Sequence, residues 1–186
     1  GETYVVFDKS DSFGSSFDLS SLDGTNGYRI DGIVAGDLAA GQSTAGDVNG
    51  DGFDDILIGA NADGGISDPG ETYVVFGKAS GYSSTFQLSS LNGTNGFRLD
   101  GIDSEARNAG DVNGDGFSDI VIGARAGNAA GTPNAGQSFL VFGANFTDAV
   151  THAGTSSADT LVGDATANVI VAGQGNDTLD GNGGAD

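Results

Sequence analysis

Residues 47–55 read DVNGDGFDD, and residues 111–119 read DVNGDGFSD. In both copies, side chains that carry oxygen occupy positions 1, 3, 5 and 9 of the nonapeptide, and a glycine occupies position 6. Alternate residues of a tightly curled loop point to its inside, so each loop would gather three carboxylates and one amide. Such a concentration of negative charge is unfavourable unless a cation is bound there.

Oxygen ligands without His or Cys favour Ca²⁺ over the transition metals. Glycine at position 6 permits the sharp bend of such loops, and the backbone carbonyl at position 7 would complete the protein ligands. Position 8 is Asp54 in one copy and Ser118 in the other, so only position 8 loses its carboxylate. The predicted ligands are Asp47, Asn49, Asp51, Phe53 and Asp55 in the first loop, and Asp111, Asn113, Asp115, Phe117 and Asp119 in the second. The alternative is a pair of exposed acidic turns that bind no metal.

The residues after each loop distinguish between families of calcium loops. An EF-hand carries a bidentate Glu at position 12 and continues into a helix, whereas position 12 is Ile58 in the first copy and Ile122 in the second. The runs 55–60 and 119–124 are short, apolar, rich in β-branched residues and closed by Gly-Ala. These features predict buried strands, so each loop should join two strands.

At this point the sequence resembles the FG-GAP repeats of integrin-α-like β-propellers. Phe-Gly pairs lie at 76–77 and 142–143, and Gly-Ala pairs lie at 59–60 and 123–124, although the family's frequent Pro is replaced by Asn61 and Arg125. The resemblance covers about residues 1–148. It implies that the Ca²⁺ loop links the first two strands of each blade, and that the protein serves adhesion or binds a cell-surface protein or glycan.

Other internal copies support this organisation. GETYVVF occurs at 1–7 and 70–76, and a looser copy, GQSFLVF, occurs at 136–142. Residues 17–33 and 86–102 agree at 13 of 17 positions. A period near 66 residues with four strands per unit predicts an all-β fold of antiparallel four-stranded propeller blades. Because closed propellers need about four to eight blades, the chain is expected to form incomplete blades, either as a fragment of a larger protein or in association with other copies.

A different repeat follows the blades. Residues 149–158, which include the sole histidine, His152, are expected to form a linker. Residues 172–180 (AGQGNDTLD) and 181–186 (GNGGAD) resemble the RTX, or haemolysin-type, nonapeptide Gly-Gly-x-Gly-x-Asp-x-apolar-x. The resemblance implies a short β-roll over 159–186 that binds Ca²⁺ between successive turns, with Asp177 and Asp186 as candidate ligands. One and a half repeats would lack the opposing turns, so capping turns without metal are the alternative.

Composition excludes several classes of function. Twenty-six acidic residues against six basic ones give a net charge of −20, which disfavours nucleic acid and anionic membranes as partners. The chain has no Cys for disulfides, and no apolar run reaches the roughly 20 residues of a membrane span. It contains neither a Gly-x-Ser-x-Gly elbow nor a His-Glu-x-x-His motif, so it is not expected to be an enzyme.

The sequence therefore predicts a calcium-stabilised, non-enzymatic repeat module of a secreted or cell-surface bacterial protein. The RTX resemblance implies export by a type I system and folding in external Ca²⁺. The alternatives are a non-catalytic part of a large secreted hydrolase or lyase, and a structural spacer. Partner contacts are expected where the copies diverge, at 34–45, 61–69 and 125–135. Four strand aromatics are expected in the core: Tyr73, Phe76, Phe139 and Phe142. Arg29 and Arg98, which hold the same position in both copies, are expected to have a packing or ion-pair role rather than one in specific recognition.

Overall fold

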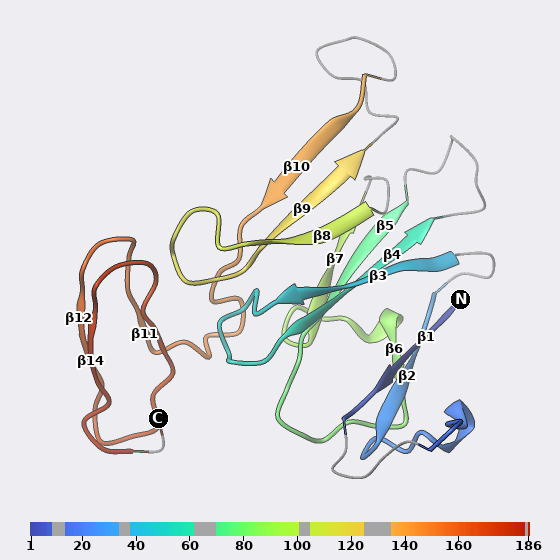
Figure 1. Ribbon diagram of the computed structural model, residues 1–186, viewed down its shortest axis with the longest axis horizontal. Helices are drawn as coiled ribbons and strands as arrows, with labels where there is room; N and C mark the ends of the chain where they lie inside the picture. Colours follow the sequence, from blue (N-terminus) through green and yellow to red (C-terminus); the bar gives the residue numbers. More distant parts are fainter. Residues whose placement is uncertain (9–13, 34–37, 62–69, 101–104, 125–134, 185) are drawn as a thin grey trace.

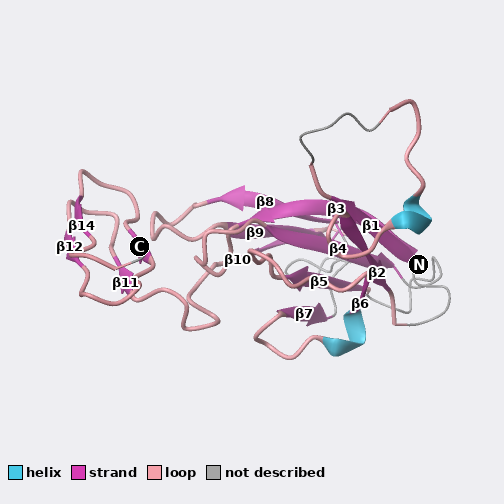
Figure 2. Cartoon of the chain, turned by 90° about the horizontal axis from the view of Figure 1, so that it is seen from below, coloured by secondary structure: helices cyan, strands magenta, loops and turns pink. Residues whose placement is uncertain are grey.

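The computed structural model describes residues 1–8, 14–33, 38–61, 70–100, 105–124, 135–184 and 186. Within these ranges the chain forms three neighbouring β-sheets, two short 3-10 helices and a narrow roll at one end of the molecule (Figures 1 and 2). None of the described helices is long and apolar enough to cross a membrane. The prediction of an all-β fold is confirmed.

The central sheet is a complete antiparallel blade. It contains β3 (Leu38–Gly46), β4 (Asp55–Asn61), β5 (Glu71–Val75) and β7 (Gly96–Asp100), hydrogen-bonded in the order β3-β4-β5-β7. The third sheet contains the same first three strands of the repeat: β8 (Glu105–Gly110), β9 (Asp119–Ala124) and β10 (Gln137–Val141). The described strands therefore form blades of the predicted kind but no closed propeller.

The first sheet contains the last two strands of a repeat, β1 (Glu2–Val6) and β2 (Gly27–Asp31). A third strand, β6 (Thr85–Gln87), comes from the segment between β5 and β7 and pairs with β2 in parallel. The Tyr28 and Tyr82 rings stack at a centroid distance of 4.9 Å beside this pairing. The 3-10 helices η1 (Leu19–Ser21) and η2 (Leu88–Ser90) occupy equivalent positions in the two copies. β6 therefore joins the central blade to the one before it.

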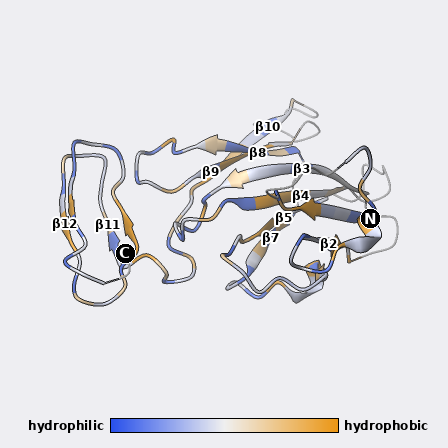
Figure 3. Cartoon of the chain, turned by 60° about the horizontal axis from the view of Figure 1, so that its bottom comes forward, coloured by the Kyte–Doolittle hydropathy of each residue, from blue (hydrophilic) through white to orange (hydrophobic). Residues whose placement is uncertain are grey.

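Two hydrophobic cores lie on opposite faces of the central sheet. Leu57 and Val74 pack with Ile120 and Ile122 of the third sheet, whereas Ile58 and the neighbouring Tyr73 pack with residues of the first sheet. Because both faces are covered, β4 is continuously apolar from Ile56 to Ala60, between the polar ends Asp55 and Asn61, rather than alternating (Figure 3).

Burial differs between copies of the same strand. Tyr73 and Phe76 of the central sheet are buried as predicted, but Phe139 and Phe142 are 38% and 51% exposed, so the prediction that they belong to the core is wrong. Among the described strands β10 lies at the edge of its sheet, and no outer strand covers its side chains. The total accessible surface, 9,980 Å², exceeds the about 8,200 Å² expected for a compact monomer of this mass.

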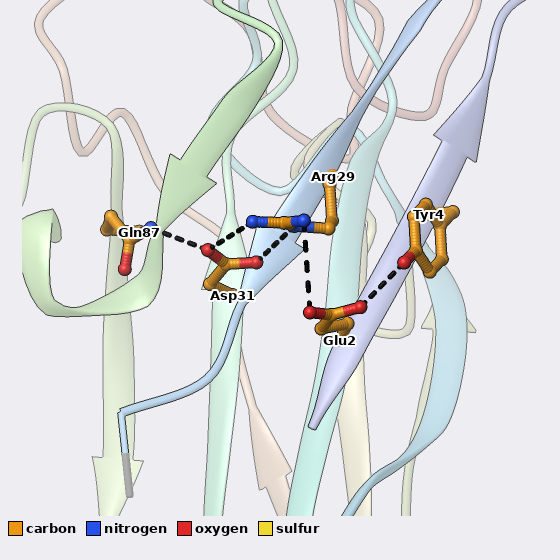
Figure 4. Close-up of polar contacts among 5 residues, drawn as sticks. All are labelled: Glu2, Tyr4, Arg29, Asp31 and Gln87. Carbon is orange, nitrogen blue, oxygen red and sulfur yellow. Dashed lines mark hydrogen bonds and ion pairs between the residues drawn. The ribbon is translucent and has the colours of Figure 1, made fainter. Parts of the chain in front are cut away.

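The arginines repeated in β2 and β7 form surface ion pairs, one of the two roles that the sequence predicted for them. Arg29 Nε lies 2.6 Å from Asp31 Oδ1, and Arg29 Nη1 lies 3.8 Å from Glu2 Oε1. Gln87 also donates to Asp31 at 2.7 Å. Because Asp31 lies in β2 and Gln87 in β6, the polar network in Figure 4 connects these two paired strands. In the second copy, Arg98 pairs with Asp100.

The roll consists of two stacked coils. β11 (His152–Ala153) pairs in parallel with β13 (Ile170–Val171), and β12 (Thr160–Val162) pairs with β14 (Thr178–Asp180). Both pairings join residues 18 positions apart, which is two nonapeptides. The roll thus begins inside the segment 149–158, for which the sequence predicted a linker. The sequence predicted a degenerate leading repeat only from Asp159 onward, because Thr155 and Ser157 replace motif glycines in the turn before it.

Candidate calcium sites

Each acidic nonapeptide forms the loop between the first two strands of its blade, as predicted. The first loop connects β3 to β4, and the second connects β8 to β9. A register shift in the ladder precedes each loop, between Thr44 and Gly46 and between Asn108 and Gly110. At position 6, Gly52 and Gly116 both have φ of +88°, a conformation that side chains disfavour.

The carboxylate at position 1 organises the curl. Asp47 Oδ1 accepts hydrogen bonds from the backbone N–H groups of Gly50 and Asp51, at 2.7 and 3.0 Å, and Oδ2 accepts one from Gly52 at 2.8 Å. Asp111 accepts the same three bonds from Gly114, Asp115 and Gly116. The two loops therefore share one backbone conformation.

Positions 3 and 5 interact with each other inside the loop. Asn49 Nδ2 donates to Asp51 Oδ2 at 3.0 Å, and the Phe53 N–H donates to Asp51 Oδ1 at 2.9 Å. Asn113 and Asp115 form the equivalent side-chain bond at 2.8 Å. The side chains at positions 1, 3 and 5 thus face a common interior, as the spacing predicted.

The aspartate at position 9 connects the loop to a distant strand end. Asp55 accepts from the Val48 N–H at 2.9 Å and from the Gly77 N–H at 2.8 Å, and its side chain is fully buried. Asp119 is equally buried and accepts from the N–H groups of Val112 and Gly143.

Gly77 and Gly143 belong to the candidate sites through these hydrogen bonds, which the sequence did not predict. They are the glycines of the two Phe-Gly pairs. A Cβ at Gly77 would overlap the Asp54 carbonyl, and one at Gly143 would overlap that of Ser118. The repeated Phe-Gly pairs were visible in the sequence. Only the fold, however, brings the N–H groups of their glycines to the aspartates at position 9 of the loops.

Burial raises the pKa values of two aspartates in the first loop, Asp47 and Asp55. Desolvation raises the pKa of Asp55 to about 7, the negative charges of Asp51 and Asp47 add to this rise, and the N–H donors of Gly77 and Val48 oppose it. Burial also raises the pKa of Asp47, against the lowering effect of the backbone N–H groups it accepts from. The first loop therefore concentrates carboxylates whose ionised form is unfavourable without a nearby cation.

The donor set of the loops fits Ca²⁺ by its chemistry, since it contains only carboxylate and amide oxygens and a backbone carbonyl. Among the described residues, no three acidic or histidine side chains are arranged as a metal-binding group, because the carboxylates are directed at backbone N–H groups. Asp47 Oδ1 and Asp111 Oδ1 each accept two of these bonds, whereas the other carboxylate oxygens accept one and keep a second lone pair with which they could bind a metal. The ten loop residues remain predicted ligands.

The turns of the roll also stack. The Asp159 N–H donates to Asp177 Oδ1 at 2.8 Å, and the Asn168 N–H donates to Asp186 Oδ1 at 2.8 Å. The leading coil thus supplies the opposing turns that the sequence was expected to lack. Asp177 and Asp186 remain predicted ligands. His152 is half-buried in β11, with Nδ1 3.0 Å from Thr151 Oγ1.

Comparison with known families agrees with this geometry. The FG-GAP repeat family matches residues 39–75 and 108–141, each of which contains one acidic loop and its flanking strands. The RTX calcium-binding nonapeptide repeat, in four copies, matches residues 153–186, which contain all of the roll except His152. No solved structure matches the chain.

FG-GAP and RTX repeats are typical of extracellular proteins, and RTX nonapeptide repeats bind Ca²⁺. The chain therefore carries FG-GAP repeats followed by RTX calcium-binding nonapeptide repeats and is a Ca²⁺-binding repeat module of the extracellular type.

Proposed function

We propose that this module is part of a secreted or cell-surface protein in which Ca²⁺ binding in both loops and in the roll switches the chain from a loose to a folded state. The single observation that carries the proposal is the fully buried aspartate at position 9 of each loop, next to further loop carboxylates. A cation would compensate this charge and stabilise the folded state.

The proposed mechanism is linkage between binding and folding. When Ca²⁺ is scarce, as in a cytosol, the loop carboxylates repel one another and weaken the fold. Outside the cell, where Ca²⁺ is abundant, its binding free energy adds to the stability of the folded state. Extracellular sites of this kind have dissociation constants of about 10⁻⁴–10⁻³ M, a range suited to such a switch. Export through a type I system is part of the proposal.

Within that protein the module would serve adhesion, by binding a protein or glycan, rather than catalysis. The neighbouring acids Asp54 and Asp55 could have formed a catalytic pair, but Asp54 is exposed, while Asp55 is buried with both oxygens hydrogen-bonded. The segments in which partner contacts are expected lie largely outside the described residues, at 34–37, 62–69 and 125–134. A glycan array and a cell-binding assay would separate adhesion from a spacer role, since a spacer should be silent in both.

The calcium switch is tested by far-UV circular dichroism and thermal melting of the 186-residue chain, first in EDTA and then in a few millimolar CaCl₂. The expected result is a gain of strand signal and a higher melting temperature with CaCl₂, and no such gain with MgCl₂ at the same concentration. An identical spectrum and melting temperature in EDTA and CaCl₂ would refute the proposal.

A further inference from the structure

The two loops are covered by different neighbours at the same position. At position 4 of the first loop, a Cβ added to Gly50 would lie 2.5 Å from Phe117 Cε1 and 2.7 Å from Val150 Cγ2. At position 4 of the second loop, a Cβ added to Gly114 would lie 3.1 Å from both Gln174 Cδ and Ser156 Cβ. The second loop therefore covers the first, and the roll covers the second.

Main-chain hydrogen bonds follow the same order. The Ser118 N–H donates to the Asp47 carbonyl at 2.9 Å, which connects the second loop to the first. The Gln174 N–H donates to the Gly114 carbonyl at 3.2 Å, which connects the roll to the second loop. Figure 1 shows the loop between β8 and β9 extending toward the roll. Calcium-binding elements are thus in contact from the first loop to the roll.

Position 6 shows how specific the contact with the roll is. Gly52 and Gly116 have the same φ, +88°. A Cβ at Gly52 would meet nothing within 4 Å, whereas one at Gly116 would overlap Val171 Cγ1 and lie 2.9 Å from the Gly173 N. The outer side of position 6 is therefore open in the first loop and packed against the roll in the second.

The roll contacts the second loop through one particular pair of turns. Ser156 belongs to the turn before Asp159, and Gln174 belongs to the turn before Asp177. These two turns are stacked, since the Asp159 N–H donates to Asp177 Oδ1. The turn that ends at Asp186 stacks instead on the turn that ends at Asn168, at the other bend of the roll. One bend of the roll therefore contacts the second loop, and the other is available as a control.

We propose that the bend of the roll formed by residues 154–158 and 172–177 is a docking surface for the second FG-GAP loop, and that it couples calcium binding in the two modules. The inference rests on the proposed calcium binding. Ordering this bend with Ca²⁺ fixes Gln174 and Gly173 against Gly114 and Gly116, which lowers the conformational entropy that the second loop loses when it binds its own ion. By thermodynamic reciprocity, an ion in the second loop favours binding in the docked bend to the same extent.

The first loop needs this support less. Val48 and Asn49 are fully buried, Val48 in the core between the central and third sheets, whereas the equivalent Val112 is 55% exposed and Asn113 is exposed. Ca²⁺ binding in the roll should therefore strengthen Ca²⁺ binding in the second loop and have only a weak effect on the first.

The test is a Ca²⁺ titration of the ¹⁵N-labelled 186-residue chain followed by amide NMR. The amides of Gly50 and Gly52 report on the first loop, and those of Gly114 and Gly116 report on the second. Asp177→Ala disrupts the docked bend, and Asp186→Ala disrupts the other. We expect Asp177→Ala to raise the Ca²⁺ midpoint of the second loop about fivefold or more, with the first loop unchanged and Asp186→Ala without this effect.

A second pair of variants tests the coupling without changing any residue of the roll, in case Asp177→Ala simply unfolds the roll. Gly116→Ala and Gly52→Ala carry the same backbone strain, but only Gly116→Ala presses on Val171 and Gly173. We expect Gly116→Ala to raise the Ca²⁺ midpoint of the roll amides, such as those of Gly175 and Asp177, and Gly52→Ala to leave it unchanged.

Equal shifts for Asp177→Ala and Asp186→Ala, or an unchanged second-loop midpoint in Asp177→Ala, would overturn the coupling. So would a roll midpoint unaffected by Gly116→Ala. If the loop amides of the unmodified chain do not respond to Ca²⁺ at all, the proposed function itself fails, which is a different result from loops that bind Ca²⁺ independently of the roll.

Discussion

The two acidic loops differ at one residue in nine, yet they have different surroundings. In the first, Asn49 is fully buried and Phe53 is exposed; in the second, Asn113 is exposed and Phe117 is buried. The backbone hydrogen bonds of the curl are the same in both. The nonapeptide therefore determines its own conformation, but the contribution of each residue to stability depends on which module packs against it.

The largest expected difference between the loops concerns position 7. Phe117 is 6% exposed and contacts the first loop over Gly50, whereas Phe53 is 40% exposed. Phe117→Ala should lower the free energy of unfolding by about 3–5 kcal/mol, the usual cost for a buried Phe, and Phe53→Ala by less than about 1 kcal/mol. Urea unfolding in CaCl₂ measures both variants, and equal losses would contradict the difference in packing.

The next effect is the pH dependence of the metal-free chain. The folded-state pKa of Asp55, about 7, lies above the about 3.9 of an unfolded Asp. Between these values the folded state holds the proton more tightly, so the stability contributed by this group is greatest near pH 4 and is lost as pH rises through 7. The expected change is on the order of 4 kcal/mol. Urea unfolding in EDTA from pH 4 to 8 should show this decline, and Asp55→Asn should remove it. The same slope in both proteins would show that Asp55 is not its source.

Position 4 should give a smaller difference. Gly50 and Gly114 have φ of +77° and +80°, so that alanine strains the backbone equally at both. A methyl group at Gly50 would lie 2.5 Å from the packed Phe117 ring, whereas one at Gly114 would lie 3.1 Å from both Ser156 Cβ and the exposed Gln174 side chain, a milder overlap. Gly50→Ala should cost about 1–3 kcal/mol more than Gly114→Ala, from overpacking. Thermal melting in CaCl₂ provides the comparison. A larger fall in melting temperature for Gly114→Ala than for Gly50→Ala would contradict the tighter packing of the first loop at position 4.

The smallest effect is expected for the repeated arginines on the strands outside the loops. Arg29 forms ion pairs with Glu2 and Asp31, and Asp31 also accepts a hydrogen bond from Gln87, whereas Arg98 forms an ion pair with Asp100. The Arg98–Asp100 pair is exposed and the Arg29–Asp31 pair is partly exposed, so salt screens both. Replacing either arginine with Ala should change the urea midpoint only slightly, and more for Arg29. The difference should disappear in 1 M NaCl. A large, salt-independent loss would indicate packing rather than an ion pair.

Much of the fold could be predicted because its signals are local. The apolar runs after each loop predicted β4 and β9, and the oxygen spacing predicted which side chains face the interior of each loop. Glycine at position 6 predicted the sharp bend. These features depend on side-chain alternation and backbone conformation within nine or ten residues, so that identical stretches give the same result twice.

Other features depend on residues far apart in the chain. The sequence contained the Phe-Gly pairs, but only the tertiary structure brings the Gly77 and Gly143 amides to the buried aspartates. The first turn of the leading coil has Thr155 and Ser157 in place of motif glycines, and the coil is defined by its pairing with a coil 18 residues later. Phe139 has the pattern of a core residue, yet it is exposed because β10 lies at the edge of its sheet among the described strands.

By itself, then, the sequence determined the curled acidic loops, the strands they join and the all-oxygen chemistry that favours Ca²⁺, because each of these follows from neighbouring residues. The tertiary structure decided which loop is buried, which aromatic side chains are covered and which turn of the roll contacts the second loop. Those outcomes depend on what packs against each copy, and identical residues acquire different burial when their neighbours differ.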